Sequence, residues 1–245
     1  MVGDRELTPD RLLLYLGKFN LNKWTEPGSQ AREVKQIYIH PNYGGNGGVG
    51  SDLAVLEMSS HAEYSPYVQP ACIWPWRSTE DKVDYSDLSP LIGKLGTVVG
   101  WGRDEHGNKV SSIPRLASIP IVSQEECLRS GQSYAYLTSN RTFCAGFRNG
   151  TGPCNGDSGG GLMFPVSEDE NGRNGNIRWF LRGIVSLSLL DFKKGTCDLN
   201  NYIIFTDVSK YGDWISQFID LDLFYAFPSR QNRNGSASTS TTTEA

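Results

Sequence analysis

A run of glycines surrounds one aspartate and one serine in the segment Gly152–Leu162. Glycines on both sides of Ser158 allow a backbone whose N–H groups converge on a single point. The Ser158 hydroxyl could then attack a carbonyl carbon, while the N–H groups of Gly156 and Ser158 receive the developing oxyanion. Taken alone, the segment also fits a glycine-rich turn with an incidental Asp-Ser pair. The pattern therefore indicates acyl-transfer chemistry if other parts of the chain support the serine.

Three further features of the sequence favour the chemical interpretation. Cys154 precedes the serine by four residues, and the upstream segments Ser51–Leu56 (SDLAVL) and Val98–Gly102 (VVGWG) have no explanation in an incidental turn. Asp52 stands directly before a short apolar run that is typical of a buried strand. A carboxylate and a nucleophile from separate segments of the chain are thus available to one site.

Five motifs occur in the order and approximate spacing of one known family. They are SDLAVL around Asp52, VVGWG at 98–102, GDSGG around Ser158, GIVS at 183–186 and FTDVSKYGDWI at 205–215. Over about residues 1–220 the chain resembles the chymotrypsin/trypsin family of serine proteases. The segment GPCNGDSGGGL around Ser158 is similar to that of the gastrulation-defective and modular cascade proteases of insects. The resemblance implies an all-β protein with two six-stranded antiparallel Greek-key β-barrels, the first one incomplete, and a C-terminal α-helix.

The pattern of apolar residues predicts many short strands and a single helix. Short apolar or alternating runs between Gly, Pro and Asn turns are typical of strands. The expected strands are 12–17, 34–39, 52–56, 94–101, 119–122, 179–185 and 202–208, and the expected helix is 208–219. We expect residues 1–84 to form a remnant of the first barrel with the linker, and 85–226 to form the second barrel and the helix. Residues 227–245 are rich in Ser and Thr and are expected to be disordered.

The resemblance also implies a role for each residue of the catalytic segment. Ser158 is expected to be the nucleophile and Asp52 the buried carboxylate that orients a histidine and stabilises its imidazolium. Gly156 and Ser158 would form the oxyanion hole. Asp157 would receive the new N-terminal ammonium when a zymogen is cleaved.

The primary specificity pocket is expected to lack charge. Gly152, six residues before the serine, matches the floor of the pocket, where trypsin-like members place an aspartate that selects Lys or Arg. Ile203 stands in place of a pocket-wall glycine, which would narrow the pocket. The other substrate-binding positions implied by the resemblance are Asn155, Ser186, Leu187 and Ser188. Small or medium apolar side chains are therefore the expected preference.

The five cysteines have no CxxC or Cys/His spacing, which argues against zinc and for disulfides. The resemblance implies the pairs Cys127–Cys144 and Cys154–Cys197. It also matches Cys72 to the cysteine that tethers an upstream pro-segment. Three Asn-x-Ser/Thr sequons, at Asn140, Asn149 and Asn234, favour a secreted glycoprotein.

The general base of the family has no counterpart in its usual sequence context. The chain holds three histidines, at positions 40, 61 and 106, and none lies in the Ala-Ala-His-Cys context. Residues 1–17 resemble the stretch that follows that histidine. We therefore expect an N-terminally truncated protease that is inactive as given. The alternative is a non-catalytic serine protease homologue that binds partners through the same groove.

Charge and composition exclude several classes of function. The net charge is −4, and we find no Lys/Arg cluster, so a nucleic-acid partner is not expected. No apolar run approaches the roughly 20 residues of a membrane span. The segment Met1–Glu6 has no apolar core of a signal peptide, although the full-length product is expected to be extracellular. Protein substrates are the expected partners, and no metal or cofactor is expected.

Overall fold

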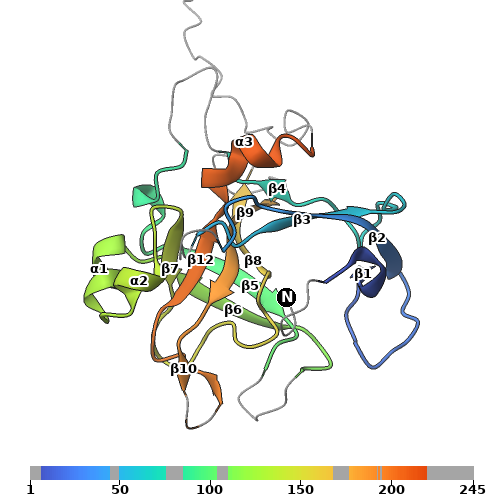
Figure 1. Cartoon of the computed structure of the whole chain (residues 1–245). Helices are drawn as coiled ribbons and strands as arrows, with labels where there is room; N and C mark the ends of the chain where they lie inside the picture. Colours follow the sequence, from blue (N-terminus) through green and yellow to red (C-terminus); the bar gives the residue numbers. More distant parts are fainter. Residues whose placement is uncertain are drawn as a thin grey trace, which may run out of the picture.

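A computed structural model of the chain describes residues 7–44, 50–75, 85–103, 110–167, 177–191, 193 and 195–219. Figure 1 shows two parts, a curled barrel sheet and a smaller sheet of early strands, with the C-terminal helix α3 close to both. The expectation for residues 227–245 lies outside the described residues.

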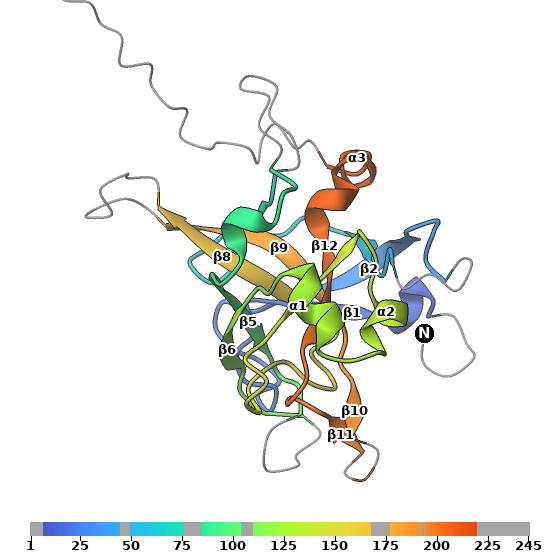
Figure 2. The ribbon, with the colours of Figure 1, turned by 90° about the vertical axis from the view of Figure 1, so that its left-hand side faces the viewer.

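The larger part is a closed antiparallel barrel. Its strands follow the order β6-β5-β8-β9-β12-β7 (Figures 1 and 2). A bridge between Ile121 and Ala145 joins the end of β6 to β7 and closes the ring. The bounds are β5 Leu95–Gly100, β6 Arg115–Pro120, β7 Thr142–Ala145, β8 Gly161–Ser167, β9 Ile177–Leu187 and β12 Ile203–Asp207. Closure leaves this sheet without a free edge along the ring.

Inward-facing apolar side chains fill the barrel. The fully buried members include Ile119, Leu162 and Phe205, and the Phe143 and Phe205 rings stack with their centroids 5.5 Å apart. On β5 the inward residue Val98 alternates with the exposed Val99, as the period of two in a strand requires. Apolar burial on this scale stabilises the barrel and holds its loops in place.

The smaller part is a three-stranded antiparallel sheet. It contains the 3₁₀ turn η1 (Pro9–Arg11) and the strands β1 (Leu13–Leu16), β2 (Gln30–Ile39) and β3 (Ala54–Met58) in the order β1-β2-β3. The pairs Ile37–Leu56 and Ile39–Ala54 place apolar residues on one face. Leu56 is 38% exposed and Ile39 41% exposed, so this face is only partly covered. The expectation that the first barrel is incomplete therefore fits the structure.

A short linking strand joins the two parts. Strand β4 (Cys72–Ile73) pairs in parallel with β9, and the 3₁₀ turn η3 (Ser89–Leu91) follows. The fully buried Arg182 forms an ion pair with Asp207, lies over the Trp74 ring and donates a hydrogen bond to the Ser86 carbonyl. A buried arginine needs such partners because an unpaired charge is costly to bury.

The expectation of a single helix was wrong. Helix α1 (Gln124–Arg129) begins after Ser123, whose side chain accepts a hydrogen bond from the Glu126 N–H, and α2 is Tyr134–Leu137. The C-terminal helix is shorter than 208–219, because it consists of the 3₁₀ turn η4 (Val208–Tyr211) and α3 (Gly212–Ile215). A small hairpin, β10 (Leu190–Asp191) with β11 (Thr196–Cys197), completes the described elements.

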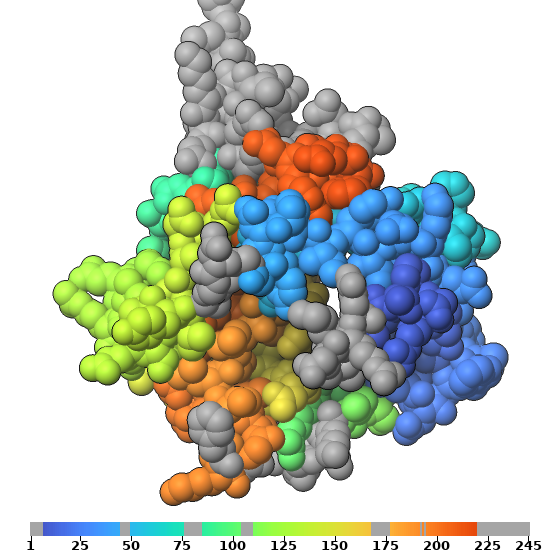
Figure 3. Space-filling model, viewed as in Figure 1, coloured from blue at the N-terminus to red at the C-terminus, as the bar shows by residue number. Residues whose placement is uncertain are grey.

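In Figure 3 the surface of the early strands lies beside that of the barrel, and the C-terminal helix covers the upper side of both. Side chains agree with this arrangement. Tyr38 of β2 packs on Phe218 with ring centroids 4.7 Å apart, and Leu53 packs in one buried cluster with Val208, Tyr211 and Ile215. The segment that carries Asp52 is thereby fixed against the barrel.

Candidate active site

The Ser158 loop is pinned to the central barrel strand β9. The Gly159 N–H donates to the Val185 carbonyl, and the Val185 N–H donates to the Gly160 carbonyl, both at 2.9 Å. Gly156 and Gly159 have φ angles of 100° and 85°, which residues with a side chain rarely adopt. The glycines around the serine are therefore required by the path of the loop.

Ser158 itself is exposed at the surface of this loop. Within the described residues its hydroxyl has no hydrogen-bond partner, and the N–H groups of Gly156 and Ser158 have no acceptor. Unpaired N–H groups beside an accessible hydroxyl are the arrangement that an oxyanion intermediate requires.

Asp157 points away from Ser158 toward strand β5. Its carboxylate accepts hydrogen bonds from the N–H groups of Gly102 at 2.8 Å and Cys154 at 3.0 Å. A Cβ atom at Gly100 would lie 2.0 Å from Asp157 Oδ1, and one at Gly102 would lie 2.3 Å from Oδ2. The glycines of the VVGWG segment are thus the space that the carboxylate occupies.

A cavity of about 700 Å³ opens beside Asp157. It is lined by Gly150–Cys154, by Thr196–Asn200 and by residues of β5 and β6. Its lining carries both signs of charge, from Asp157, Asp191, Asp198, Arg103 and Arg115. The cavity is large enough for a peptide segment or a side chain.

Two of the pocket residues expected from the sequence, Gly152 and Ile203, are in close contact. Ile203 is 1% exposed, and its Cδ1 lies 2.7 Å from the position that a Cβ of Gly152 would take. Leu187, at the end of β9, is partly buried and pairs with Ile204 of β12, while Ser188 follows it. Asn155 is exposed, and its N–H donates to Cys197 Sγ at 3.2 Å.

Asp52 is held by two hydroxyl groups from the barrel. Ser186 Oγ donates to Asp52 Oδ2 at 2.7 Å, and Thr206 Oγ1 donates to the Asp52 carbonyl at 3.0 Å. From the sequence, Ser186 was expected to bind substrate, and its hydrogen bond to Asp52 was not expected. Thr206 was missed, although it lies within the FTDVSKYGDWI motif that marked this region.

The residue before Asp52 has an unusual backbone. Ser51 is 2% exposed and has a φ angle of 63°. The Tyr211 hydroxyl accepts a hydrogen bond from the Ser51 N–H at 2.7 Å, and the Arg141 guanidinium lies over the Tyr211 ring. A left-handed serine costs about 1 kcal/mol or more, so the surrounding contacts must hold it.

Two of the three histidines, His40 and His61, lie in the described part of the chain. His40 is 7% exposed, its Nδ1 accepts a hydrogen bond from the Asn42 N–H, and its ring packs on Tyr211 and Trp214. Burial, and then the Arg141 cation, lower the pKa of His40. His61 is exposed, and His106 lies outside the described residues. Neither described imidazole has a hydrogen bond to Asp52 or Ser158.

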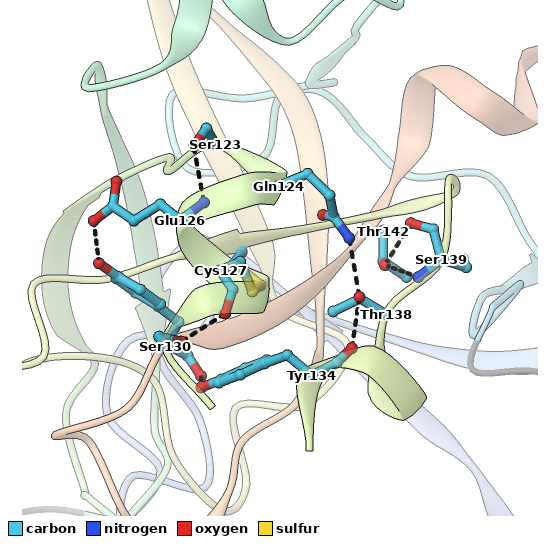
Figure 4. The surroundings of a disulfide bond; sticks show 11 residues. Ser123, Gln124, Glu126, Cys127, Ser130, Tyr134, Thr138, Ser139 and Thr142 are labelled. Carbon is cyan, nitrogen blue, oxygen red and sulfur yellow. Dashed lines mark hydrogen bonds between the residues drawn. A yellow bond between two sulfur atoms is a disulfide. The ribbon is translucent and has the colours of Figure 1, made fainter. Parts of the chain in front are cut away.

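Both expected disulfides are present, Cys127–Cys144 and Cys154–Cys197. Figure 4 shows the surroundings of the first one, where Cys127 belongs to α1 and Tyr134 to α2. The Tyr134 hydroxyl donates to the Tyr202 carbonyl, and the Tyr202 hydroxyl donates to the Glu126 carboxylate. Burial, and then the Glu126 carboxylate, raise the pKa of Tyr202. The second disulfide ties the Ser158 loop to β11.

Two absences hold for the described part of the chain. It contains no group of three or more His, Cys, Asp or Glu that could bind a metal ion. No helix within it is long and apolar enough to span a membrane. Cys72 is partly buried and is not in a disulfide.

Comparisons with known proteins agree with this geometry. A family model for trypsin matches residues 5–215. Serine protease gd of Drosophila melanogaster is 32% identical over 88% of this chain and 43% of its own length. Clotting factor C of Tachypleus tridentatus is 31% identical (87% and 20%), and coagulation factor IX of Cavia porcellus is 34% identical (81% and 61%).

This chain therefore spans less than two thirds of each of these three relatives. The model match nevertheless covers nearly all of the described elements, from β1 to α3. The order of motifs, the barrel and the two disulfides lead to the same assignment: the chain belongs to the trypsin family of serine proteases.

Proposed function

We propose that the protein is a secreted serine endopeptidase of a proteolytic cascade, in which Ser158 attacks the substrate carbonyl. The observation that carries this proposal is the Ser158 loop, where an exposed hydroxyl stands beside two N–H groups that have no acceptor among the described residues. The N–H groups of Gly156 and Ser158 would bind the oxyanion as it forms.

In this proposal Asp52 orients the imidazole that takes the serine proton. Its hydrogen bonds from Ser186 and Thr206 support the role, because they fix both the carboxylate and the backbone of Asp52. A fixed carboxylate sets the tautomer of a histidine and stabilises its cation.

The histidine itself is proposed to come from a segment beyond these 245 residues. The buried position of His40 and the exposed position of His61 support this, since neither has a hydrogen bond to Asp52 or Ser158. The partly exposed apolar face around Ile39 and Leu56 supports it too, because further strands could cover it. Without a base the 245-residue chain would have only the weak residual activity of an isolated oxyanion hole.

Activation is proposed to involve Asp157. A liberated N-terminal ammonium could enter the cavity that Asp157 lines and pair with its carboxylate. Cys72 is proposed to tether a pro-segment.

Ile203 beside Gly152 would favour small or medium apolar side chains in the primary pocket.

A fluorophosphonate, which labels only activated serines, tests this function. We expect labelling at Ser158 of a longer product that includes the upstream segment, and none of the 245-residue chain. Ser158→Ala should abolish the label, whereas Ser133→Ala, at an exposed position before α2, should keep it.

The second candidate is a non-catalytic homologue of the serine proteases. It would bind partners through the surface around Ser158 and the primary pocket. The lack of a described imidazole at Asp52 or Ser158 favours it. An unlabelled longer product that still binds substrate-like peptides would establish this function instead.

A further inference from the structure

The turn between β7 and the Ser158 loop carries an accessible Asn-Gly-Thr sequence. Asn149, Gly150 and Thr151 are all exposed. The Asn149 side-chain oxygen accepts a hydrogen bond from the Thr151 N–H at 3.1 Å, while its Nδ2 has no partner within the described residues. The amide nitrogen therefore points to solvent from a side chain that is already oriented.

Contacts on both sides fix the position of this turn. Arg148 donates through Nε to the Asn200 carbonyl at 3.1 Å, and its guanidinium lies 5.3 Å from the centre of the Tyr202 ring. The Gly150 N–H donates to the Leu199 carbonyl at 3.2 Å. A group attached to Asn149 would therefore project from a defined place on the surface.

A second sequon within the described residues differs in its hydroxyl residue. Thr142 of the Asn140 sequon is 6% exposed, and its Oγ1 both donates to the Ser139 carbonyl and accepts from the Ser139 N–H. Folding therefore closes the Asn140 sequon to an enzyme that needs the threonine, whereas the Asn149 sequon stays open before and after folding. Asn234 lies outside the described residues.

We propose that Asn149 carries an N-linked glycan that covers one rim of the cavity beside Asp157. In the transfer step Asn149 Nδ2 attacks the anomeric carbon of a lipid-pyrophosphate-linked oligosaccharide. The carbon–oxygen bond to the pyrophosphate breaks, the lipid pyrophosphate leaves with the electron pair, and Nδ2 loses one proton. This inference rests on the proposed secretion, which the two disulfides support because they form in the same oxidising compartment.

The location gives the glycan a consequence for access. Gly150 and Thr151 line the cavity together with Asp198, Leu199 and Asn200. A sugar chain on the residue before Gly150 stands at this rim. It would hinder a folded protein from approaching the turn, while small molecules would still reach the cavity.

Occupancy is tested on the full 245-residue chain fused behind a cleavable secretory signal and expressed in animal cells. Total protein, retained and secreted, is treated with peptide N-glycosidase in heavy-oxygen water, which marks each formerly glycosylated asparagine as labelled aspartate. Trypsin cleavage after Arg141 and Arg148 then places the Asn140 and Asn149 sequons on separate peptides. We expect labelled aspartate at 149 well above the level that spontaneous deamidation of Asn149-Gly150 gives in a sample without the glycosidase, and one glycan fewer in Asn149→Gln. Unmodified Asn149 in this material would overturn the proposal.

Masking is tested by limited trypsin digestion of the folded glycoprotein. Cleavage after Arg148 should be several-fold faster in Asn149→Gln than in the parent chain. Cleavage after Arg129, whose side chain is 79% exposed on α1, serves as the internal control and should not change. Equal rates at Arg148 would refute masking. Glycan occupancy does not depend on catalysis, so Ser158→Ala should keep the glycan, and the fluorophosphonate experiment fails or succeeds separately.

Discussion

The hydroxyl oxygen of Tyr211 lies 2.7 Å from the backbone nitrogen of Ser51 and accepts its hydrogen bond. Tyr211 belongs to η4, which follows the last barrel strand, and Ser51 directly precedes Asp52. The contact thus ties the C-terminal helix region to the backbone that presents the carboxylate. Residues 160 positions apart in the sequence meet at this point.

Removing that hydroxyl should destabilise the protein. Tyr211→Phe leaves the buried Ser51 N–H without an acceptor, which costs about 1 to 3 kcal/mol. Tyr136→Phe is the matched control, because Tyr136 is 79% exposed. Urea unfolding should show a lower midpoint for Tyr211→Phe only. Equal midpoints for the two variants would show that the contact does not hold Ser51.

Adding one methyl group should displace the Asp157 carboxylate. In Gly102→Ala the new Cβ would lie 2.3 Å from Asp157 Oδ2, and such overpacking costs about 1 to 3 kcal/mol. Gly131→Ala is the control, since its nearest neighbour is Tyr134 at an ordinary 3.6 Å. Thermal unfolding measures both. A Gly102→Ala chain as stable as Gly131→Ala would contradict the close fit.

The Ser186 hydroxyl should matter to both stability and catalysis. Ser186→Ala removes the hydrogen bond to Asp52 Oδ2, and bonds to charged groups contribute about 1.5 to 3 kcal/mol. Chemical denaturation should show this loss, and the longer product should label more slowly with fluorophosphonate. Ser133→Ala should change neither measurement. An unchanged unfolding free energy in Ser186→Ala would argue against a firmly held Asp52.

Stability should fall in mild acid because of His40. Burial and Arg141 lower the pKa of His40 in the folded state, so the unfolded chain binds a proton at higher pH than the folded one. The contribution is complete above the unfolded pKa near 6.5 and declines below it, by at most about 1.4 kcal/mol per pH unit. Denaturation between pH 7.5 and 5 should reveal this slope, and His40→Gln should reduce it. His61→Gln should keep the slope, whereas a slope that survives in His40→Gln would assign it to other groups.

Loss of the Cys154–Cys197 disulfide should lower the free energy of unfolding more than loss of Cys127–Cys144. The Cys154–Cys197 bridge closes 43 residues and the Cys127–Cys144 bridge 17, which corresponds to about 4 and about 3 kcal/mol in the chain-entropy model. Double alanine variants of each pair, compared by denaturation, test the order. Only loss of Cys154–Cys197 should also raise hydrogen exchange at Gly156–Gly160. Unchanged exchange there would contradict a role in holding the serine loop.

The sequence predicted three of the six strands of the barrel ring closely, and the family resemblance implied the two cysteine pairs that the structure contains. The expected strands 94–101, 179–185 and 202–208 match β5, β9 and β12 to within two residues. The expected strand 119–122 only overlaps the end of β6, and β7 and β8 were missed. The helix at Gln124–Arg129 was missed since it spans six residues, too few for a clear helical period, although Ser123 and Glu126 have the spacing of a capping box.

The environment of the carboxylates could not be predicted from the sequence. Thr206 and Tyr211 lie more than 150 positions from the residues that they contact, and only the closed barrel brings them together. The sequence suggests only that Gly100 and Gly102 lie in a strand or a turn. In the structure, their missing side chains leave the volume that the Asp157 carboxylate occupies. Such relations depend on tertiary packing, which local patterns do not carry.

The parallel pairing of β4 with β9 has a mechanical consequence. The linker from the first sheet contributes strand β4 to the barrel. In the same linker, the Trp74 ring and the Ser86 carbonyl both contact the Arg182 guanidinium. A nick in an exposed loop of the first sheet would therefore leave its fragment bound to the barrel. Separating the two parts requires breaking the pairing of β4 with β9 and exposing the buried Arg182 guanidinium. The two parts should therefore stay associated during digestion and purification.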